Sequence, residues 1–430
     1  MRKIIELITR KEYKVLIINF FSLSILQGLN IILPFLTFPF IIKKTGIDGF
    51  GTITYASTIV IFFVMFIEFG FNTIATREIS ININNPTKIQ NIFNEVISTK
   101  LVIFGACSII FVFLLIVIPK FRENSLIYFY SYLSTIGYVI FPLWLFHGTQ
   151  KMKFVTYINV FYKTIFTICI FIFLKSKDNL WVVPLFNSLG LIFSGVTSII
   201  LAYKIFNLKF SFSSFINIKK QFKNSFPLFS SELYVTLTAY TNILILGTFS
   251  GDYAVGVYSA AEKLIRAIGG LVLPIINSLF PYISNLFKVN YNKARNELTK
   301  IIKFGSISLL ILVIILFYFS ELIFDIVYKN SNKVDLEKSV TIFRIMITFP
   351  LFSFLDLVFG RLILLTNRKE KDFFRVFSIS FIIGLATSFV LIYKFNYIGA
   401  AISNSFIQVL IATGMIYYAL PILNKNKVSS

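Results

Sequence analysis

The feature that most constrains this chain is a series of apolar runs, each near the length that crosses a lipid bilayer. Residues 102–118, 185–202 and 307–319 are examples, and short basic segments separate such runs. A transmembrane helix needs about 20 mainly apolar residues. Soluble domains are about 45–50% apolar, whereas 57% of this chain is hydrophobic and only 14% is charged. The chain is therefore predicted to be an all-α integral membrane protein.

The apolar runs divide into about twelve predicted transmembrane helices. Their approximate bounds are 15–42, 51–70, 101–119, 126–146, 154–174, 180–203, 226–247, 254–285, 304–319, 339–366, 376–393 and 398–420.

Basic residues predict the orientation of these helices. With the N-terminus inside, 26 of the 41 Lys and Arg residues fall in inner segments and 10 in outer ones. Acidic residues divide almost evenly, 7 inside and 8 outside. Cytoplasmic segments of membrane proteins carry an excess of Lys and Arg, while Asp and Glu contribute little to orientation. Both termini are therefore predicted to be cytoplasmic.

Several function classes lack support in the sequence. A net charge of +22 would suggest nucleic acid in a soluble protein, but orientation accounts for the charge here, so no nucleic-acid partner is expected. Cys107 and Cys169 fall within apolar spans and His147 is the only histidine, so no metal or cofactor is expected. No catalytic or nucleotide-binding motif occurs, so the chain is not expected to be an enzyme.

Two echoes in the sequence indicate an internal repeat. Gly51 opens GTITYAS and Gly256 opens GVYSAAE, and the tripeptide FPL at 141–143 recurs at 349–351. The nearly equal offsets predict two parallel six-helix halves, and transporters built from such repeats commonly have the substrate site between them. The predicted domains are residues 1–203, a cytoplasmic linker at 204–225, and residues 226–430.

The first helix of each half carries a polar stripe with steps of three and four residues, which places each stripe on one helical face. The stripes are Gln27, Asn30, Pro34 and Thr37 in the first half and Ser231, Tyr234, Thr238 and Thr241 in the second. Such faces turn toward other helices or a wet cavity. Interhelical contact and cavity lining both remain open; the candidates for lining are Gln27, Asn30, Ser231, Tyr234 and Thr238.

Charged residues inside the spans are candidates for a functional site, because a charge at mid-bilayer costs at least ~2.5–3.5 kcal/mol. Lys163 lies near the middle of the fifth span, and Glu262, Lys263 and Arg266 cluster in the eighth. Fixed cations in a shielded cavity suit an anionic substrate, although internal salt bridges are the alternative. Arg344 lies nearer a span end, where a structural role is favoured.

Acidic residues in the spans are candidates for ion coupling. Without a nucleotide site, uphill transport would draw on an ion gradient or on the gradient of the substrate itself. Asp356, Glu232 and Glu262 are then the predicted carriers of a proton or another cation.

Three segments resemble motifs of the Wzx-type polysaccharide repeat-unit flippases. Residues 69–79 (FGFNTIATREI) resemble the "GF…ATR" signature, and PLWLF at 142–146 with Gly148 and Met152 resembles "P-x-W-x-F-x-G…M". VGVYSAAEK at 255–263, followed by LFP at 279–281, resembles "VG-x-Y-x-AA-x-K…LFP". Their order and spacing place the chain near this family.

The resemblance implies a member of the multidrug/oligosaccharidyl-lipid/polysaccharide exporter superfamily, with two six-helix bundles around a cationic cavity and alternating access. The implied cargo is an undecaprenyl-diphosphate-linked oligosaccharide, moved to the periplasmic leaflet of a bacterial inner membrane for O-antigen or capsule synthesis. Polysaccharide polymerase machinery and membrane lipid are the implied partners. Arg77 and Lys263 occupy motif positions, and Arg77 suits a headgroup anchor as well as substrate contact.

Rival functions come from other classes. A drug/cation antiporter of the same superfamily would export small molecules, and an acidic cavity would favour it. A membrane glycosyltransferase or polymerase would be an enzyme with a large extramembrane loop. The longest outer loop, about residues 320–338, is short, which favours a flippase.

Overall fold

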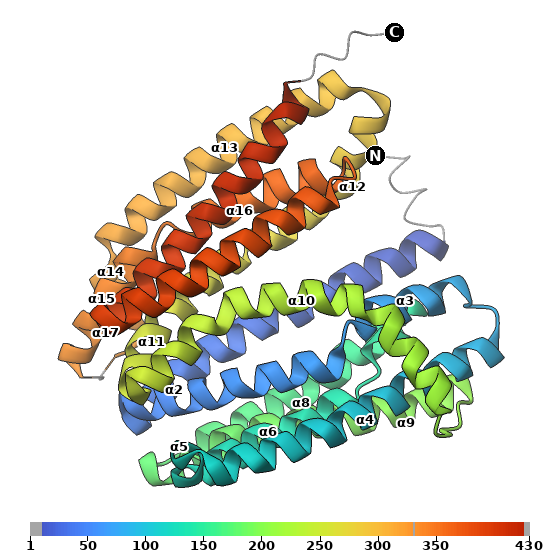
Figure 1. Cartoon of the computed structure of the whole chain (residues 1–430), viewed down its shortest axis with the longest axis horizontal. Coiled ribbons are helices and arrows are strands. Elements are labelled where there is room, and N and C mark those ends of the chain that lie inside the picture. The colour runs from blue at the N-terminus through green and yellow to red at the C-terminus, as the bar shows by residue number, and fades with distance from the viewer. Residues whose placement is uncertain (1–10, 330–331, 425–430) are drawn as a thin grey trace. The chain divides into compact units, whose positions relative to one another are not determined.

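The computed structural model describes residues 11–329 and 332–424. The side chains of residues 11–27, 29–32 and 231 lie outside this description. Within the described residues the chain is helical and contains no strand (Figure 1). It divides into two compact units, residues 1–37 with 56–233 and residues 38–55 with 234–430.

The first unit is built from most of α2 through to the start of α10. Its helices are α2 (Lys11–Glu68), α3 (Phe71–Ile81), α4 (Pro86–Val117), α5 (Pro119–Glu123), α6 (Ser125–Ile140), α7 (Leu143–Gly148), α8 (Met152–Phe173), η1 (Lys177–Asn179), α9 (Val182–Phe206) and the first part of α10 (Phe215–Phe249).

The second unit contains residues 38–55 of α2, the rest of α10 and all later helices. These are α11 (Gly251–Gly270), α12 (Val272–Val289), α13 (Tyr291–Tyr318), α14 (Ser320–Val327), α15 (Lys333–Met346), α16 (Phe349–Leu357), the π-helix η2 (Val358–Leu365) and α17 (Glu370–Leu423).

Two long helices contain turns where the sequence predicts outer loops. The backbone of α2 leaves helical geometry at Gly46 (φ 75°), and that of α17 does so at Asn396 (φ 53°). Nine described segments are long and apolar enough to cross a membrane, and the first and last of them each contain one of these turns. With the 35-residue α10, the described chain has about twelve membrane helices, which confirms the predicted fold class.

The repeated FPL tripeptide marks a helix break in both halves. Pro142 separates α6 from α7, and Pro350 stands at the start of α16, just after α15 ends at Met346. Proline has no backbone N–H to donate within a helix, so it fits a first turn and weakens a helix interior. The echo therefore reflects the same interruption in corresponding spans.

The repeated glycines Gly51 and Gly256 meet where α2 crosses α11. A Cβ atom at Gly51 would overlap the backbone of Asp252, and one at Gly256 would overlap the carbonyl of Ile47. Beside this crossing, Thr52 Oγ1 donates a hydrogen bond of 2.6 Å to the Asp252 carboxylate. These contacts explain why residues 38–55 group with the second unit.

The predicted linker is partly helical, since residues 215–225 belong to α10. The extended part before it is held against α4, where Asn94 Nδ2 donates to Ser211 Oγ at 2.8 Å and the Ser213 N–H donates to Ser98 Oγ at 2.9 Å. The bundle boundaries at residues 203 and 226 stay a prediction.

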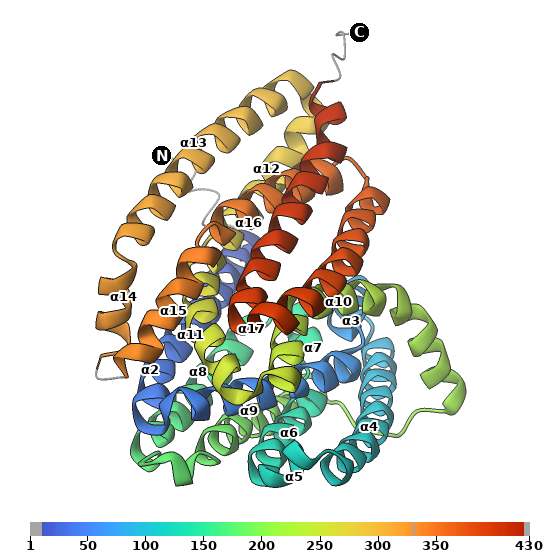
Figure 2. The ribbon, with the colours of Figure 1, turned by 60° about the vertical axis from the view of Figure 1, so that its left-hand side comes forward.

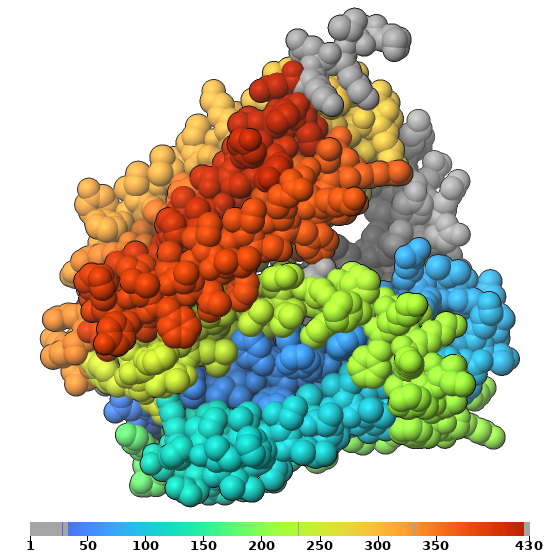
Figure 3. Space-filling model, in the orientation of Figure 1, coloured from blue at the N-terminus to red at the C-terminus, as the bar shows by residue number. Residues whose placement is uncertain are grey.

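Exposed apolar side chains cover the outer face of α13. This helix runs along the outside of the second unit in both ribbon views, and the space-filling view leaves its visible side chains uncovered (Figures 1, 2 and 3). The exposed apolar residues include Ile307, Leu310, Ile311 and Ile314. An apolar stripe with no protein cover suits contact with lipid tails.

In the first unit, α6 packs closely against α9 through glycine. A Cβ atom at Gly137 would lie 2.7 Å from the backbone carbon of Leu191, and one at Gly195 would lie 2.6 Å from Ile140 Cγ1. Gly190, on α9 as well, faces Phe166, and a Cβ atom there would stand at an ordinary contact distance of 3.5 Å. Small residues allow helices to approach closely in membranes.

The two glycines Gly137 and Gly190 therefore differ in their tolerance of alanine. Gly137→Ala should destabilise the protein by about 1–3 kcal/mol, because the added methyl group overpacks the α6–α9 contact. Gly190→Ala should leave stability unchanged or slightly raised, because alanine favours the helix. Melting temperatures of the two purified variants in detergent test this contrast, and equal melting temperatures would contradict it.

Candidate functional site

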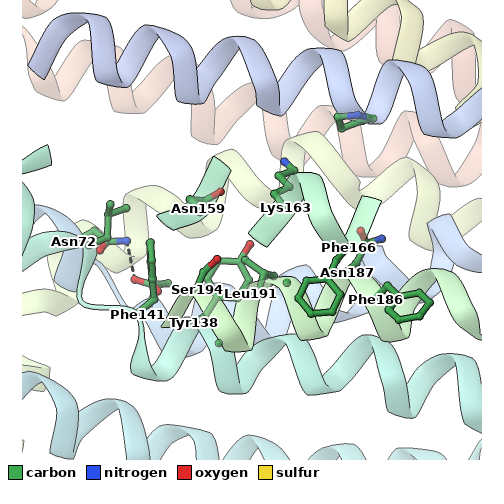
Figure 4. Close-up of a pocket in the computed structure, with 15 residues that line it drawn as sticks. Asn72, Tyr138, Phe141, Asn159, Lys163, Phe166, Phe186, Asn187, Leu191 and Ser194 are labelled. Carbon is green, nitrogen blue, oxygen red and sulfur yellow. Dashed lines mark hydrogen bonds between the residues drawn. The ribbon is translucent and has the colours of Figure 1, made fainter. Parts of the chain in front are cut away.

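A cavity of 430 Å³ lies within the first unit, between α2, α3, α6, α8 and α9 (Figure 4). From α8 it is lined by Asn159, Lys163 and Phe166, which steps of four and three residues place on one helical face. From α9 it is lined by Asn187 and Ser194, among others. The predicted substrate residue Lys163 thus lies on the wall of a cavity together with amide and hydroxyl groups.

The remaining walls combine aromatic rings with polar groups. Phe141 and Phe186 join Phe166 among the lining residues, and Asn72 and Glu68 line the end near α3. Ligand pockets are typically 300–1,000 Å³ and mainly apolar, with a few polar groups that fix orientation. The size and composition of this cavity suit a small organic ligand or part of a larger one.

The end of the cavity near α3 is organised by an ion pair. Lys100 Nζ lies 2.9 Å from Glu68 Oε1, and its side chain is 0% exposed. Lys100 also donates to the carbonyl of Tyr138 at 3.1 Å. Asn72 Nδ2 donates to Glu68 Oε2 at 2.7 Å (Figure 4). Both oxygens of the Glu68 carboxylate are therefore engaged by hydrogen-bond donors.

Lys100 is a residue that the sequence reasoning missed. The predicted span began at residue 101, which placed Lys100 in an inner loop, whereas α4 begins at Pro86 and buries Lys100 fully. The signal was present in the sequence: Asn85 accepts from the Lys88 N–H as an N-cap, and proline follows it at the first helical position.

Glu232, a predicted ion carrier, belongs to the first unit. It is hydrogen-bonded to the Gly70 backbone and lies within electrostatic range of Glu68. It does not appear among the described residues that line the cavity. Arg77, a predicted substrate residue, is exposed on α3 and is likewise absent from the described lining.

In the second unit, the predicted cluster on α11 forms an ion-paired group. Arg266 Nε donates to Glu262 Oε1 one helical turn away, and Arg266 Nη2 donates to the Ala239 carbonyl at 3.0 Å. Lys263 Nζ lies 4.0 Å from Glu262 Oε2, and the Glu262 side chain is 1% exposed. One carboxylate therefore faces two cations, and the group keeps a net positive charge.

Arg266 and Asp356 line one cavity of 100 Å³ in the second unit, together with Thr238 from the predicted polar stripe. Gln408 Nε2 donates to Asp356 Oδ2 across this cavity. The helix changes to π geometry at Val358, directly after the α16 segment that carries Asp356. Such segments are rare and often occur at functional sites.

Next to this cavity is a buried polar network that the sequence reasoning also missed. Asn404 Nδ2 donates to Tyr258 at 3.0 Å, and Ser388 Oγ donates to Asn242 Oδ1 at 2.6 Å. Ser388 also shares a hydrogen bond of 2.7 Å with Ser403. Small polar residues scattered along apolar helices give little signal until their partners are known.

The other predicted residues have separate surroundings. Arg344 donates to Ser320 Oγ at 2.8 Å and to Glu321 Oε1 at 3.0 Å, and it is absent from the described lining of either cavity. Tyr234 packs edge-on against Phe381. The side chains of Gln27, Asn30 and Ser231 lie outside the described residues.

The Lys100–Glu68 pair should dominate the stability of the first unit. Lys100→Met should destabilise the protein by about 3–5 kcal/mol, because it leaves the Glu68 carboxylate without its counter-charge. The double variant Lys100→Met/Glu68→Gln should regain most of this loss. Melting temperatures in detergent measure both effects.

Lys300→Met is the control, because Lys300 forms an exposed surface pair with Glu297. It should change stability by about 0.5 kcal/mol or less. A double variant as unstable as Lys100→Met alone would show that the pair does not carry the effect.

Comparison with known proteins agrees with this architecture. The family model "Polysaccharide biosynthesis protein" matches residues 16–287. A relative from Escherichia coli (strain K12), provisionally named as an O-antigen transporter, is 26% identical over 404 residues, which cover 93% of this chain and 95% of the relative.

Two solved structures share the fold at low sequence identity. An inward-facing multidrug resistance MATE family transporter of the MOP superfamily superposes with a TM-score of 0.72 at 13% identity, covering 92% of this chain and 96% of that one. The lipid II flippase MurJ, in an inward closed conformation, gives a TM-score of 0.71 at 16% identity, covering 92% and 86%.

The family model covers more than half of the chain, including α11 and its cationic cluster. The chain is a multi-pass membrane protein that belongs to the polysaccharide biosynthesis protein family.

Proposed function

We propose that this protein is a flippase that moves an undecaprenyl-diphosphate-linked oligosaccharide from the cytoplasmic to the periplasmic leaflet by alternating access. The observation that carries the proposal is the α11 cluster, where Lys263 and Arg266 face the single carboxylate of Glu262 inside a membrane helix. A surplus of fixed positive charge there suits an anionic group such as a diphosphate. The relative's name and the family's role in polysaccharide biosynthesis support the same cargo.

The proposed substrate residues fall into two groups. Lys163 lines the cavity of the first unit, and Arg266 lines that of the second, with Lys263 one turn away across Glu262. Arg77 and Arg344 would act nearer the surface, where Arg77 is exposed and Arg344 is balanced by Glu321. Lys263 and Arg266 are the residues that we expect to contribute most to diphosphate binding.

Asp356 is the strongest candidate for ion coupling. It is one of the lining residues of the cavity that also contains Arg266, and its carboxylate is held by Gln408. Glu262 is engaged by two cations, and Glu232 is hydrogen-bonded to the Gly70 backbone. For each of them a structural role is the alternative to ion coupling.

The same reasoning ranks the rival functions. A drug/cation antiporter would suit an acidic cavity, whereas the α11 cluster has more positive than negative charge. The Escherichia coli relative is named as a transporter rather than as an enzyme. The flipped unit would then pass to polysaccharide polymerase machinery for O-antigen or capsule assembly.

Loss of the protein should cause undecaprenyl-linked oligosaccharide to accumulate in its host, and the wild-type chain should clear it. Arg266→Gln should impair clearance on the order of tenfold or more, because a hydrogen bond to a charged group contributes about 1.5–3 kcal/mol.

Asp356→Asn should reduce clearance and should make it insensitive to changes in the proton or sodium gradient, because the variant side chain cannot carry the coupling ion. Lipid extracts analysed by mass spectrometry provide the measurement.

Lys300→Gln is the matched control, since it removes a cation from an exposed helix surface. Normal lipid levels in the deletion strain, together with a new small-molecule efflux defect, would replace the flippase proposal with the antiporter.

The proposed inner-membrane topology, with both termini cytoplasmic, has a direct test. In a background with Cys107→Ala and Cys169→Ala, Asp178→Cys should react with a membrane-impermeant maleimide in intact spheroplasts. Asn292→Cys should react only after permeabilisation, because the excess of basic residues places its segment inside. Both positions are exposed, so burial does not explain a lack of labelling. The reverse labelling pattern would invert the topology.

A further inference from the structure

The cavity of the first unit has balanced charge. Its wall carries the Lys163 ammonium group and the Glu68 carboxylate. Among the described residues, these two are the charged side chains of the lining, one of each sign. A ligand that fits it best carries no net charge.

Three of the hydrogen-bonding side chains of the described wall are amides. Asn72, Asn159 and Asn187 come from three different helices, α3, α8 and α9, and are among the residues lining the cavity (Figure 4). Each amide offers an oxygen acceptor and two N–H donors, which matches a hydroxyl group that both donates and accepts. Asn72 Oδ1 is buried and has no hydrogen-bond partner among the described residues, although its Nδ2 is engaged by Glu68.

The apolar part of the wall includes three aromatic rings. Phe166 and Phe186 from α8 and α9 lie near each other, with ring centroids 6.1 Å apart, and Phe141 adds a third ring (Figure 4). A sugar ring presents C–H groups on its faces and hydroxyl groups around its edge. Aromatic faces bury the former, and amide side chains bind the latter.

A diphosphate would fit this cavity poorly. Phosphate sites favour arginine, which can donate two parallel hydrogen bonds, or clustered backbone N–H groups. The described residues that line the cavity include no arginine, and they include the Glu68 carboxylate. An ionised carboxylate only accepts hydrogen bonds, so Glu68 offers no donor to a phosphate oxygen.

We infer that the cavity of the first unit is the subsite for an uncharged sugar residue of the transported repeat unit. Asn159 and Asn187 bind its hydroxyl or acetamido groups, the rings of Phe166 and Phe186 cover its apolar face, and Lys163 donates to one of its oxygens. The inference rests on the proposed flippase function. It adds a sugar-binding site that is separate from the cationic cluster on α11.

The test compares two lipids that share the undecaprenyl diphosphate part, only one of which carries sugar. One is undecaprenyl diphosphate, and the other is the glycolipid extracted from a host strain that lacks this protein. Binding to the full-length purified chain is measured by native mass spectrometry. Wild type should bind the glycolipid about tenfold more tightly than undecaprenyl diphosphate, and Asn159→Leu and Asn187→Leu should each lose most of this preference while they retain affinity for undecaprenyl diphosphate.

Two further variants keep the test interpretable. Asn84→Leu repeats the substitution at an exposed turn of the same unit and should bind like wild type. Gly190→Ala adds a methyl group to the cavity wall at a normal contact distance from Phe166. It should fold well and still weaken glycolipid binding. It therefore tests the role of the cavity in binding even if an asparagine variant fails to fold.

The outcomes separate the two proposals. If the asparagine variants bind both lipids like wild type, or weaken both equally, the sugar subsite is excluded and the flippase function is unaffected. If wild type binds neither lipid and the deletion strain accumulates no glycolipid, the flippase function itself fails. Selective loss of glycolipid binding, with undecaprenyl diphosphate binding intact, supports the subsite.

Discussion

The first unit depends on the need to neutralise one buried ammonium group. Lys100 is fully buried in α4, and its charge is compensated by Glu68 of α2, while the Tyr138 carbonyl of α6 accepts a further hydrogen bond. Lipid offers no partner for such a group, so the three helices have to converge on it. The cavity forms beside this convergence and uses Glu68 as part of its wall. The ion pair is thus both a structural link and a boundary of the site.

Backbone contact, rather than charge, organises the start of the second unit. Gly51 and Gly256 allow α2 and α11 to approach so closely that a methyl group on either would overlap the other backbone. The Thr52–Asp252 hydrogen bond then fixes the crossing. Because α11 also carries Glu262, Lys263 and Arg266, this contact sets the position of the cationic cluster. The two similar glycine segments, which the sequence shows only as an echo, are in direct contact with each other in the structure.

A structural feature could be predicted from the sequence where it depends on neighbouring residues, and could not where it depends on partners far along the chain. Apolar runs and the basic loops act locally, so the sequence predicts the helices and a transporter fold; the helix break at Pro350 falls inside the predicted span 339–366. The polar groups act through distant partners. Lys163, Arg266 and Asp356 stood out because ionisable residues are rare in apolar spans, and each of them lines a cavity. Asn187, Gln408 and Lys100 did not, because an amide in a helix gives no local signal and an early helix start hid the lysine.

The two units show how one repeat can acquire two chemistries. Each contains a cavity bordered by a half-buried carboxylate that an amide side chain engages, Glu68 with Asn72 in the first and Asp356 with Gln408 in the second. In the first unit the described lining has one cation, Lys163, beside that carboxylate, and its other groups include amides and aromatic rings that suit an uncharged ligand. In the second, the described lining contains the guanidinium group of Arg266, and Lys263 lies on the same helix beside Glu262. A substrate with an uncharged sugar part and an anionic diphosphate requires both kinds of surface, and a pair of identical units would supply only one.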